Sequence, residues 1–170
     1  MVFESRRDEV FKHLELAEKF LIEGRDLILK DPIQASEKLY KAAEEAVKAL
    51  TKYLNLPQVK EVEKVGRWTT ELLFKAVLKL SEEVDGRIRS WWHTAWVLHV
   101  EGFHEGRLGS DIVLVDYGDI EALVNLTKKV ISRSEAMKTL STKPNNPTYS
   151  NANQTLILSH SFNLYKSLFV

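Results

Sequence analysis

The chain contains no cysteine among its 170 residues. This absence excludes disulfide bonds and thiol chemistry, and it fits a reducing compartment or a hot one, in which thiols are a liability. Neither sign of charge is in excess, because 24 Lys and Arg balance 24 Asp and Glu. Any nucleic-acid role would therefore depend on a local basic patch and not on the net charge.

Long hydrophobic runs are also missing. The most apolar stretch, residues 72–80 (LLFKAVLKL), is interrupted twice by lysine and is far too short to span a bilayer. Residues 1–20 carry charges every few positions, which does not fit the apolar core of a signal peptide. We therefore expect a cytoplasmic protein without a membrane association.

The composition changes near residue 140. Residues 141–170 contain no Asp, Glu or Gly, but they hold five of the seven asparagines and two of the four prolines. The sequence thus predicts a helical body over residues 1–140, followed by a low-charge C-terminal tail, rich in Pro, Asn and Ser, over residues 141–170.

Within the body, apolar residues recur every three or four positions, which is the period of an amphipathic helix. Asp31 and Pro32 suit a helix start, and Asp119 is a second candidate N-cap. Residues 55–67 are expected to form a connection, and residues 111–116 (DIVLVD) either a short helix or an extended piece. Helices are predicted over residues 4–30, 33–54, 69–84, 89–106 and 120–140.

The body shows none of the two-residue turns and period-two alternation that are typical of a sheet. We therefore expect an all-α fold, an antiparallel bundle of four or five helices with a C-terminal extension. The predicted inward face of the second helix comprises Ala35, Leu39, Ala42, Ala43, Ala46, Val47 and Leu50.

Residues 89–106 (RSWWHTAWVLHVEGFHEG) hold three of the four tryptophans and three of the five histidines. On an α-helix Trp92, Trp96 and His99 share one face, so the tryptophans indicate a packed core or a subunit interface. His99 is expected to form a hydrogen bond with a facing helix, and His104 to be solvated.

The same three histidines are candidate metal ligands by residue type. His93, His99 and His104 are six and then five positions apart, whereas metal-binding pairs on one helix are usually four apart. Offsets of five and six point in different directions on an α-helix. We therefore predict neither a metal site nor a cofactor.

Two segments resemble a known family. They are residues 34–54 (QASEKLYKAAEEAVKALTKYL) and the pattern Trp92-x2-Ala95-x2-Leu98-His99, followed by Phe103 and Glu105. Over about residues 5–137 they resemble the archaeal PaREP family, a branch of the HEPN-like helical proteins. The resemblance implies an antiparallel four-helix core with a short extra helix, similar to the substrate-binding subunits of nucleotidyltransferases. It also implies a homodimer, and members come mostly from heat-loving archaea.

The wider HEPN group includes ribonucleases that carry an Arg, four to six residues, and then a His. They cut RNA without a metal ion, by attack of the 2′-hydroxyl. Arg87 and His93 meet this spacing, so the resemblance implies that Arg87 would hold the phosphate and His93 would act as general acid or base. Ile88 departs from the pattern, because a polar residue usually follows the Arg.

A second candidate site is a ligand-binding face on the second helix. Tyr40, Glu44 and Lys48 recur at intervals of four residues. In a HEPN-like arrangement the second and fourth helices are neighbours, so these side chains would approach His99 and Trp92. A salt-bridged, solvated surface is the alternative explanation of the same pattern.

Three functions remain open at this point. The first is a non-catalytic homodimeric module that binds a nucleotide, an RNA or a protein partner. The second is a metal-independent endoribonuclease that uses Arg87 and His93. The third is a partner subunit of a small nucleotidyltransferase.

Overall fold

The computed structural model describes residues 2–141, and side-chain surroundings for residues 6–133 of these. In the described part every helix or strand element is a helix and no strand is present, so the predicted all-α class is confirmed. The predicted tail, residues 141–170, lies almost wholly outside the described residues. The elements are α1 (Val2–Leu27), α2 (Pro32–Tyr53), α3 (Pro57–Val65), α4 (Thr70–Glu83), α5 (Ile88–Val97), the π-helix η1 (Leu98–His104) and α6 (Ser110–Ser141).

Local sequence chemistry explains where α2 and α4 begin. The Asp31 carboxylate accepts a hydrogen bond from the Gln34 backbone N–H, and Pro32 occupies the first turn of α2. The Thr69 hydroxyl accepts one from the Leu72 N–H at the start of α4. Each side chain satisfies a backbone donor that has no partner within the helix.

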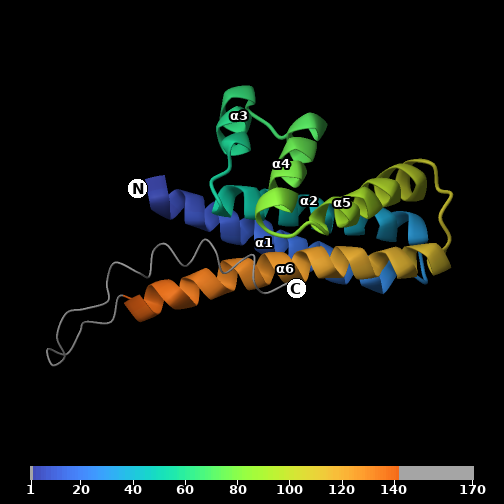
Figure 1. Cartoon of the computed structure of the whole chain (residues 1–170). Coiled ribbons are helices and arrows are strands. Elements are labelled where there is room, and N and C mark those ends of the chain that lie inside the picture. The colour runs from blue at the N-terminus through green and yellow to red at the C-terminus, as the bar shows by residue number, and fades with distance from the viewer. Residues whose placement is uncertain (1, 142–170) are drawn as a thin grey trace, which may run out of the picture. The chain divides into compact units, whose positions relative to one another are not determined.

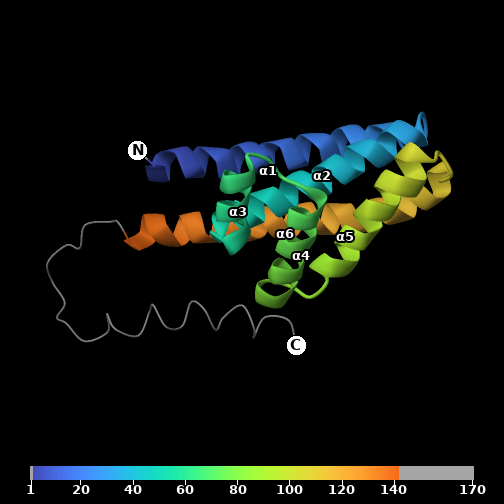
Figure 2. The ribbon, with the colours of Figure 1, turned by 90° about the horizontal axis from the view of Figure 1, so that it is seen from above.

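The core is centred on α2. Figures 1 and 2 show α1 and α2 antiparallel and side by side, with α5 and η1 along α2 and α6 returning beside them. Every predicted inward residue of α2 is completely buried. Small alanines let the neighbouring helices approach α2 closely, because short side chains leave room for the facing backbone.

Two sequence-based boundaries are wrong. Residues 57–65 form the helix α3 and not a connection: Pro57 starts it and Gly66, with a φ of 78°, ends it in the left-handed conformation. Residues 110–119 belong to one continuous helix, α6, so Asp119 is not an N-cap. Its carboxylate instead accepts a 2.6 Å hydrogen bond from the Thr94 hydroxyl on α5.

The end of the predicted fourth helix has an unusual hydrogen-bond pattern. After Val97 the helix continues as the π-helix η1, in which each hydrogen bond spans five residues. The N–H of Glu105, just after η1, donates to the Val100 carbonyl, five residues back, at 3.0 Å. Side chains five residues apart therefore lie on the same face of the π-helix, whereas in an α-helix they point in different directions.

Gly102 lets η1 approach α2. A Cβ atom at this position would lie 2.4 Å from the Ser36 Oγ and 2.6 Å from the Ser36 Cβ. Ser36 is completely buried, and its hydroxyl donates to the Pro32 carbonyl. Because Ser36 precedes Glu37 in the chain, this close contact also brings Glu37 up to η1.

The Gly102→Ala substitution is accordingly expected to lower the free energy of unfolding by about 1–3 kcal/mol, since Ser36 cannot move away. Gly118→Ala in α6 is the matched control, because its Cβ would meet nothing within 4 Å. It should leave stability unchanged or raise it by up to about 1 kcal/mol. Urea unfolding of both variants measures the difference, and equal stability would contradict the close packing of η1 on α2.

Candidate functional site

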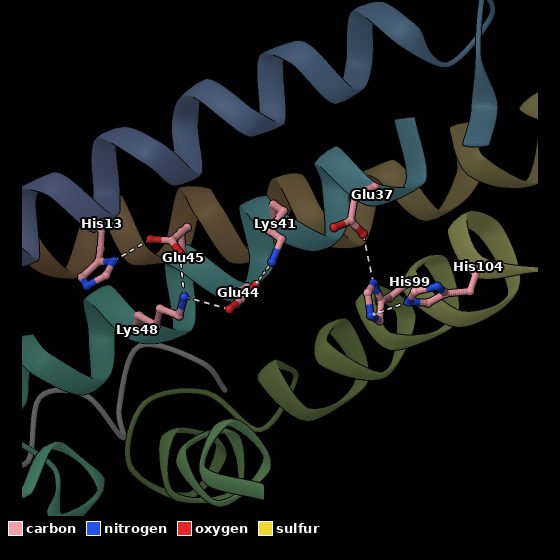
Figure 3. Close-up of polar contacts among 8 residues, drawn as sticks. All are labelled: His13, Glu37, Lys41, Glu44, Glu45, Lys48, His99 and His104. Atoms are coloured by element: carbon pink, nitrogen blue, oxygen red, sulfur yellow. Dashed lines mark hydrogen bonds and ion pairs between the residues drawn. The ribbon is translucent and has the colours of Figure 1, made fainter. Parts of the chain in front are cut away.

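His99 lies in η1 and faces α2 across a hydrogen bond. Its Nδ1 is 3.0 Å from the Glu37 Oε2, and both side chains are about one-fifth exposed, at 20% and 21% (Figure 3). An ionised carboxylate can only accept, so the imidazole Nδ1–H is the donor. The expectation that His99 bonds to a facing helix is confirmed, with Glu37 as the partner.

His104 completes a chain of three polar groups. Its Nε2 lies 3.2 Å from the Nε2 of His99, on the side of the ring opposite Glu37 (Figure 3). The π-helical turn makes this contact, because the two residues are five apart. His104 is exposed, as predicted, but the prediction that an offset of five separates the two rings is wrong.

Aromatic rings surround His99. The Tyr40 ring stacks on it with a centroid distance of 4.0 Å, and those of Trp96 and Phe103 lie at 5.7 and 6.3 Å. Trp96 and Phe103 are partly exposed, whereas Tyr40 is buried. We call Glu37, Tyr40, Trp96, His99, Phe103 and His104 the His99 cluster.

The Tyr40 phenol stays protonated at any ordinary pH. Burial raises its pKa, and the nearby negative charges of Glu44 and Glu37 raise it further. Tyr40 therefore contributes a ring face and a neutral hydroxyl to the cluster, and it does not supply a phenolate.

A second polar group lies further along α2. We call His13, Lys41, Glu44, Glu45 and Lys48 the Lys48 cluster (Figure 3). The Lys48 Nζ lies 2.8 Å from a carboxylate oxygen of both Glu44 and Glu45. The His13 Nδ1, from α1, lies 2.5 Å from the other oxygen of Glu45.

The charges of this cluster are mutually satisfied. Burial opposes ionisation of Glu44, but hydrogen bonds from Lys41 and Lys48 outweigh it, and the net effect lowers the pKa of Glu44. Glu45 has a lowered pKa too, because His13 and Lys48 overcome the same burial effect. Burial likewise opposes the charge of Lys48, but its two carboxylate partners raise its pKa. The Lys48 cluster thus joins α1 to α2, and it offers little unused charge to a ligand.

The predicted ligand-binding residues therefore divide among three places. Tyr40 contacts His99, as expected, but Glu44 and Lys48 belong to the Lys48 cluster. Trp92 is only 1% exposed and packs inside the core against Tyr40 and Phe74.

Sequence reasoning missed Glu37 and the His99–His104 contact. Glu37 lies three residues before Tyr40 and so on the same face of α2. That spacing could have indicated its role. The π-helical turn has no comparable signal in the sequence.

Arg87 and His93 do not contact each other within the chain. Asp85 holds the Arg87 guanidinium in a two-point ion pair of 2.6 to 3.2 Å, and the guanidinium lies 5.0 Å from the Trp91 ring. His93 is exposed and makes no hydrogen bond or ion pair with the described residues. A shared phosphate site would therefore require Arg87 to leave Asp85, or a second subunit.

The described residues hold neither a cluster of three metal-ligating side chains nor a membrane-spanning helix. No group of three or more His, Cys, Asp or Glu in residues 2–141 is arranged to hold a metal ion. Among the helices of that same part of the chain, none is long and apolar enough to cross a membrane.

These observations define an all-helical protein with a partly exposed histidine–aromatic cluster between its second helix and a π-helical turn. The model of the archaeal PaREP1/PaREP8 family matches residues 12–124, and the chain belongs to this family. The resemblance noted from residues 34–54 and the Trp92–His99 pattern is thereby confirmed.

Two solved structures are similar to the chain. One is a crystal structure of a Sulfolobus solfataricus protein, 40% identical, with a TM-score of 0.64; the match covers 68% of this chain and 96% of that one. The other is a solution structure of a protein described as Orf c02003, also 40% identical, with a TM-score of 0.56 and coverages of 72% and 91%. A comparison with curated proteins gave no significant match.

Proposed function

We propose that this PaREP protein is a non-catalytic, homodimeric binding module, that its ligand surface is the His99 cluster, and that the ligand is a nucleotide. The observation that carries the proposal is the pair of partly exposed aromatic residues, Trp96 and Phe103, next to the hydrogen-bonded His99. We place the fold in the HEPN-like group as part of the same proposal, supported by the antiparallel core with short additional helices.

The chemistry of this surface suits a nucleobase. A base stacks on an aromatic side chain with about 1–3 kcal/mol per base, and imidazole groups supply hydrogen bonds to its edge. A long nucleic acid is less well matched. Its affinity comes mainly from clustered Lys and Arg, whereas the chain has no net charge and the Lys48 cluster is already paired. A single nucleotide needs few phosphate contacts.

Titration with AMP, GMP, CMP and UMP, followed by the indole N–H signals in ¹H–¹⁵N spectra, tests the proposal. We expect at least one nucleotide to shift the Trp96 signal, and Trp96→Ala to weaken its binding about tenfold or more. His93→Ala is the control, because this exposed histidine lies on α5 outside the cluster, and it should bind like the wild type. Shifts that avoid Trp96 for all four nucleotides would reject the proposal.

An exposed apolar surface on α6 supports the proposed homodimer. Ile112, Leu114 and Val115 are apolar, yet they are exposed by 46%, 55% and 76%. Two copies of the chain related by a two-fold axis would cover this surface.

The double substitution Ile112→Glu and Val115→Glu is therefore expected to convert the dimer to a monomer, because it places charge at the centre of the contact. Sedimentation velocity measures the change. Leu29→Glu, at an 83% exposed leucine after α1, is the matched control and should remain dimeric. A wild-type monomer, or a dimer unaffected by the double substitution, would contradict this assignment.

The two alternatives are testable with the same preparations. Cleavage of single-stranded RNA in the presence of a chelator, abolished by His93→Ala, would replace the binding proposal with the Arg87/His93 endoribonuclease. Co-purification of a nucleotidyltransferase from the native organism would favour the partner-subunit role. No contact among the described residues favours either function over the nucleotide-binding module.

A further inference from the structure

The two histidines of the His99 cluster have the geometry of a metal-binding pair. The Nε2 atoms of His99 and His104 face each other at 3.2 Å. Two nitrogen ligands about 2.1 Å from a tetrahedral ion lie about 3.4 Å apart, so little movement would be needed to place an ion between the rings. The two nitrogen atoms that would bind the ion are those now joined by a hydrogen bond.

Glu37 supplies the other half of such a site. Metal-binding histidines almost always donate their second ring N–H to a carboxylate, carbonyl or water, which fixes the tautomer and orients the ring. His99 makes this bond through Nδ1 to the Glu37 carboxylate at 3.0 Å, which leaves its Nε2 directed at His104. The stacked Tyr40 ring, at 4.0 Å, further restricts rotation of the imidazole.

We propose that His99 and His104 bind one divalent transition-metal ion through their Nε2 atoms, with Glu37 as the outer carboxylate that orients His99. Imidazole nitrogen suits Zn²⁺, Ni²⁺, Cu²⁺ and Co²⁺, whereas Mg²⁺ and Ca²⁺ prefer oxygen ligands. No third His, Cys, Asp or Glu of residues 2–141 joins the pair, so water completes the coordination on the exposed side of His104.

The proton balance of the site follows from the hydrogen bonds. The Glu37 carboxylate requires a proton on the His99 Nδ1, and the 3.2 Å contact requires one more proton between the two Nε2 atoms. A metal ion that binds both nitrogens displaces that second proton from Nε2, and His104 then carries its proton on Nδ1, so both rings remain neutral ligands. Binding should thus release no net proton while both imidazoles are neutral.

The π-helical turn is what makes the site. In an α-helix the two histidines would point apart, whereas η1 aligns them, and π-helical turns occur frequently at functional sites.

The proposed metal site does not depend on nucleotide binding. A protein that binds Zn²⁺ but no nucleotide would retain the metal site and lose only the proposed function, and the reverse also holds.

Titration of the full chain, free of any histidine tag, with Zn²⁺ and with Co²⁺ tests the inference. We expect one ion per chain by calorimetry and visible Co²⁺ absorption bands. Mg²⁺ should give no heat. His104→Ala and His99→Ala should each weaken Zn²⁺ binding at least tenfold, and Glu37→Gln by about 10- to 100-fold.

His93→Ala is the control for adventitious binding, because His93 is an exposed histidine that lies on α5, outside the His99–His104 pair. It should bind Zn²⁺ as the wild type does. Because His104 is exposed, its replacement should leave the fold intact, which circular dichroism of the same sample verifies. Absence of Zn²⁺ and Co²⁺ binding in the wild type, or binding that His104→Ala leaves unchanged, would overturn the inference.

Discussion

Replacement of Trp92 by alanine is expected to lower the free energy of unfolding by about 3–5 kcal/mol. Trp92 is 1% exposed and lies between Tyr40 and Phe74, with ring centroids at 6.0 and 5.8 Å. Its removal leaves a cavity where α2, α4 and α5 meet. The loss should appear as a lower urea midpoint at an unchanged m-value.

Two further variants separate packing from other effects of the Trp92 substitution. Trp96→Ala is the matched control, because the same residue type one turn later is only partly buried, and it should cost clearly less stability. Trp92→Phe should also lower the free energy of unfolding by less than Trp92→Ala does. It retains most of the ring and removes an indole N–H that has no hydrogen-bond partner among the described residues. An equal loss for Trp92→Ala and Trp96→Ala would contradict the packing described for α5.

The second large effect is expected from Lys48→Met, which should lower the free energy of unfolding by about 2–4 kcal/mol at pH 7. The substitution leaves two largely buried carboxylates without their shared cation. Lys48 is 12% exposed, and Glu44 and Glu45 are 11% and 10% exposed. Lys79→Met is the matched control. Lys79 likewise pairs with two glutamates that lie three and four residues away in the chain. These ion pairs are exposed, so little change in the free energy of unfolding is expected.

The Lys48 cluster also predicts a pH dependence. The pKa values of Glu44 and Glu45 are lowered from 4.5, so their contribution is complete above that value and is lost as the pH falls through their lower native pKa values. The pKa of Lys48 is raised from 10.5, so its contribution is complete below that value and is lost as the pH rises through the native pKa.

Stability from this cluster is therefore greatest between about pH 5 and pH 10. Urea unfolding at pH 7 and at pH 3.5 should show a smaller acid-induced loss for Lys48→Met than for the wild type. A variant that loses as much stability on acidification as the wild type would show that the lowered carboxyl pKa values do not come from Lys48.

Periodicity was sufficient to predict the helices that surround the core. The alanine-rich face of α2 is buried at every position that the three-to-four spacing selects, and Asp31 and Thr69 mark helix starts through a local hydrogen bond. These features are encoded by neighbouring residues. The helix α3 was missed because its nine residues bury only Gln58 and Val59, which gives too short a pattern to recognise.

The candidate site was predicted less well, because it depends on contacts between distant segments. His99 was correctly assigned to a facing helix, but Glu37 lies 62 residues earlier in the chain. The approach of His104 to His99 requires a π-helical turn, and that turn packs where Gly102 meets Ser36. With 3.6 residues per turn, an α-helix would point the side chains of His99 and His104 in different directions. The folded chain brings these two side chains together.

The π-helical turn fixes His99 between Glu37 and His104. Long-range ¹H–¹⁵N correlation spectra of the histidine side chains test this arrangement, because they report which ring nitrogen carries the proton. We predict that His99 is protonated at Nδ1, and that its ring signals change in His104→Ala and not in His93→Ala. A His99 ring with the tautomer mixture of the exposed His93 and no response to His104→Ala would contradict the account.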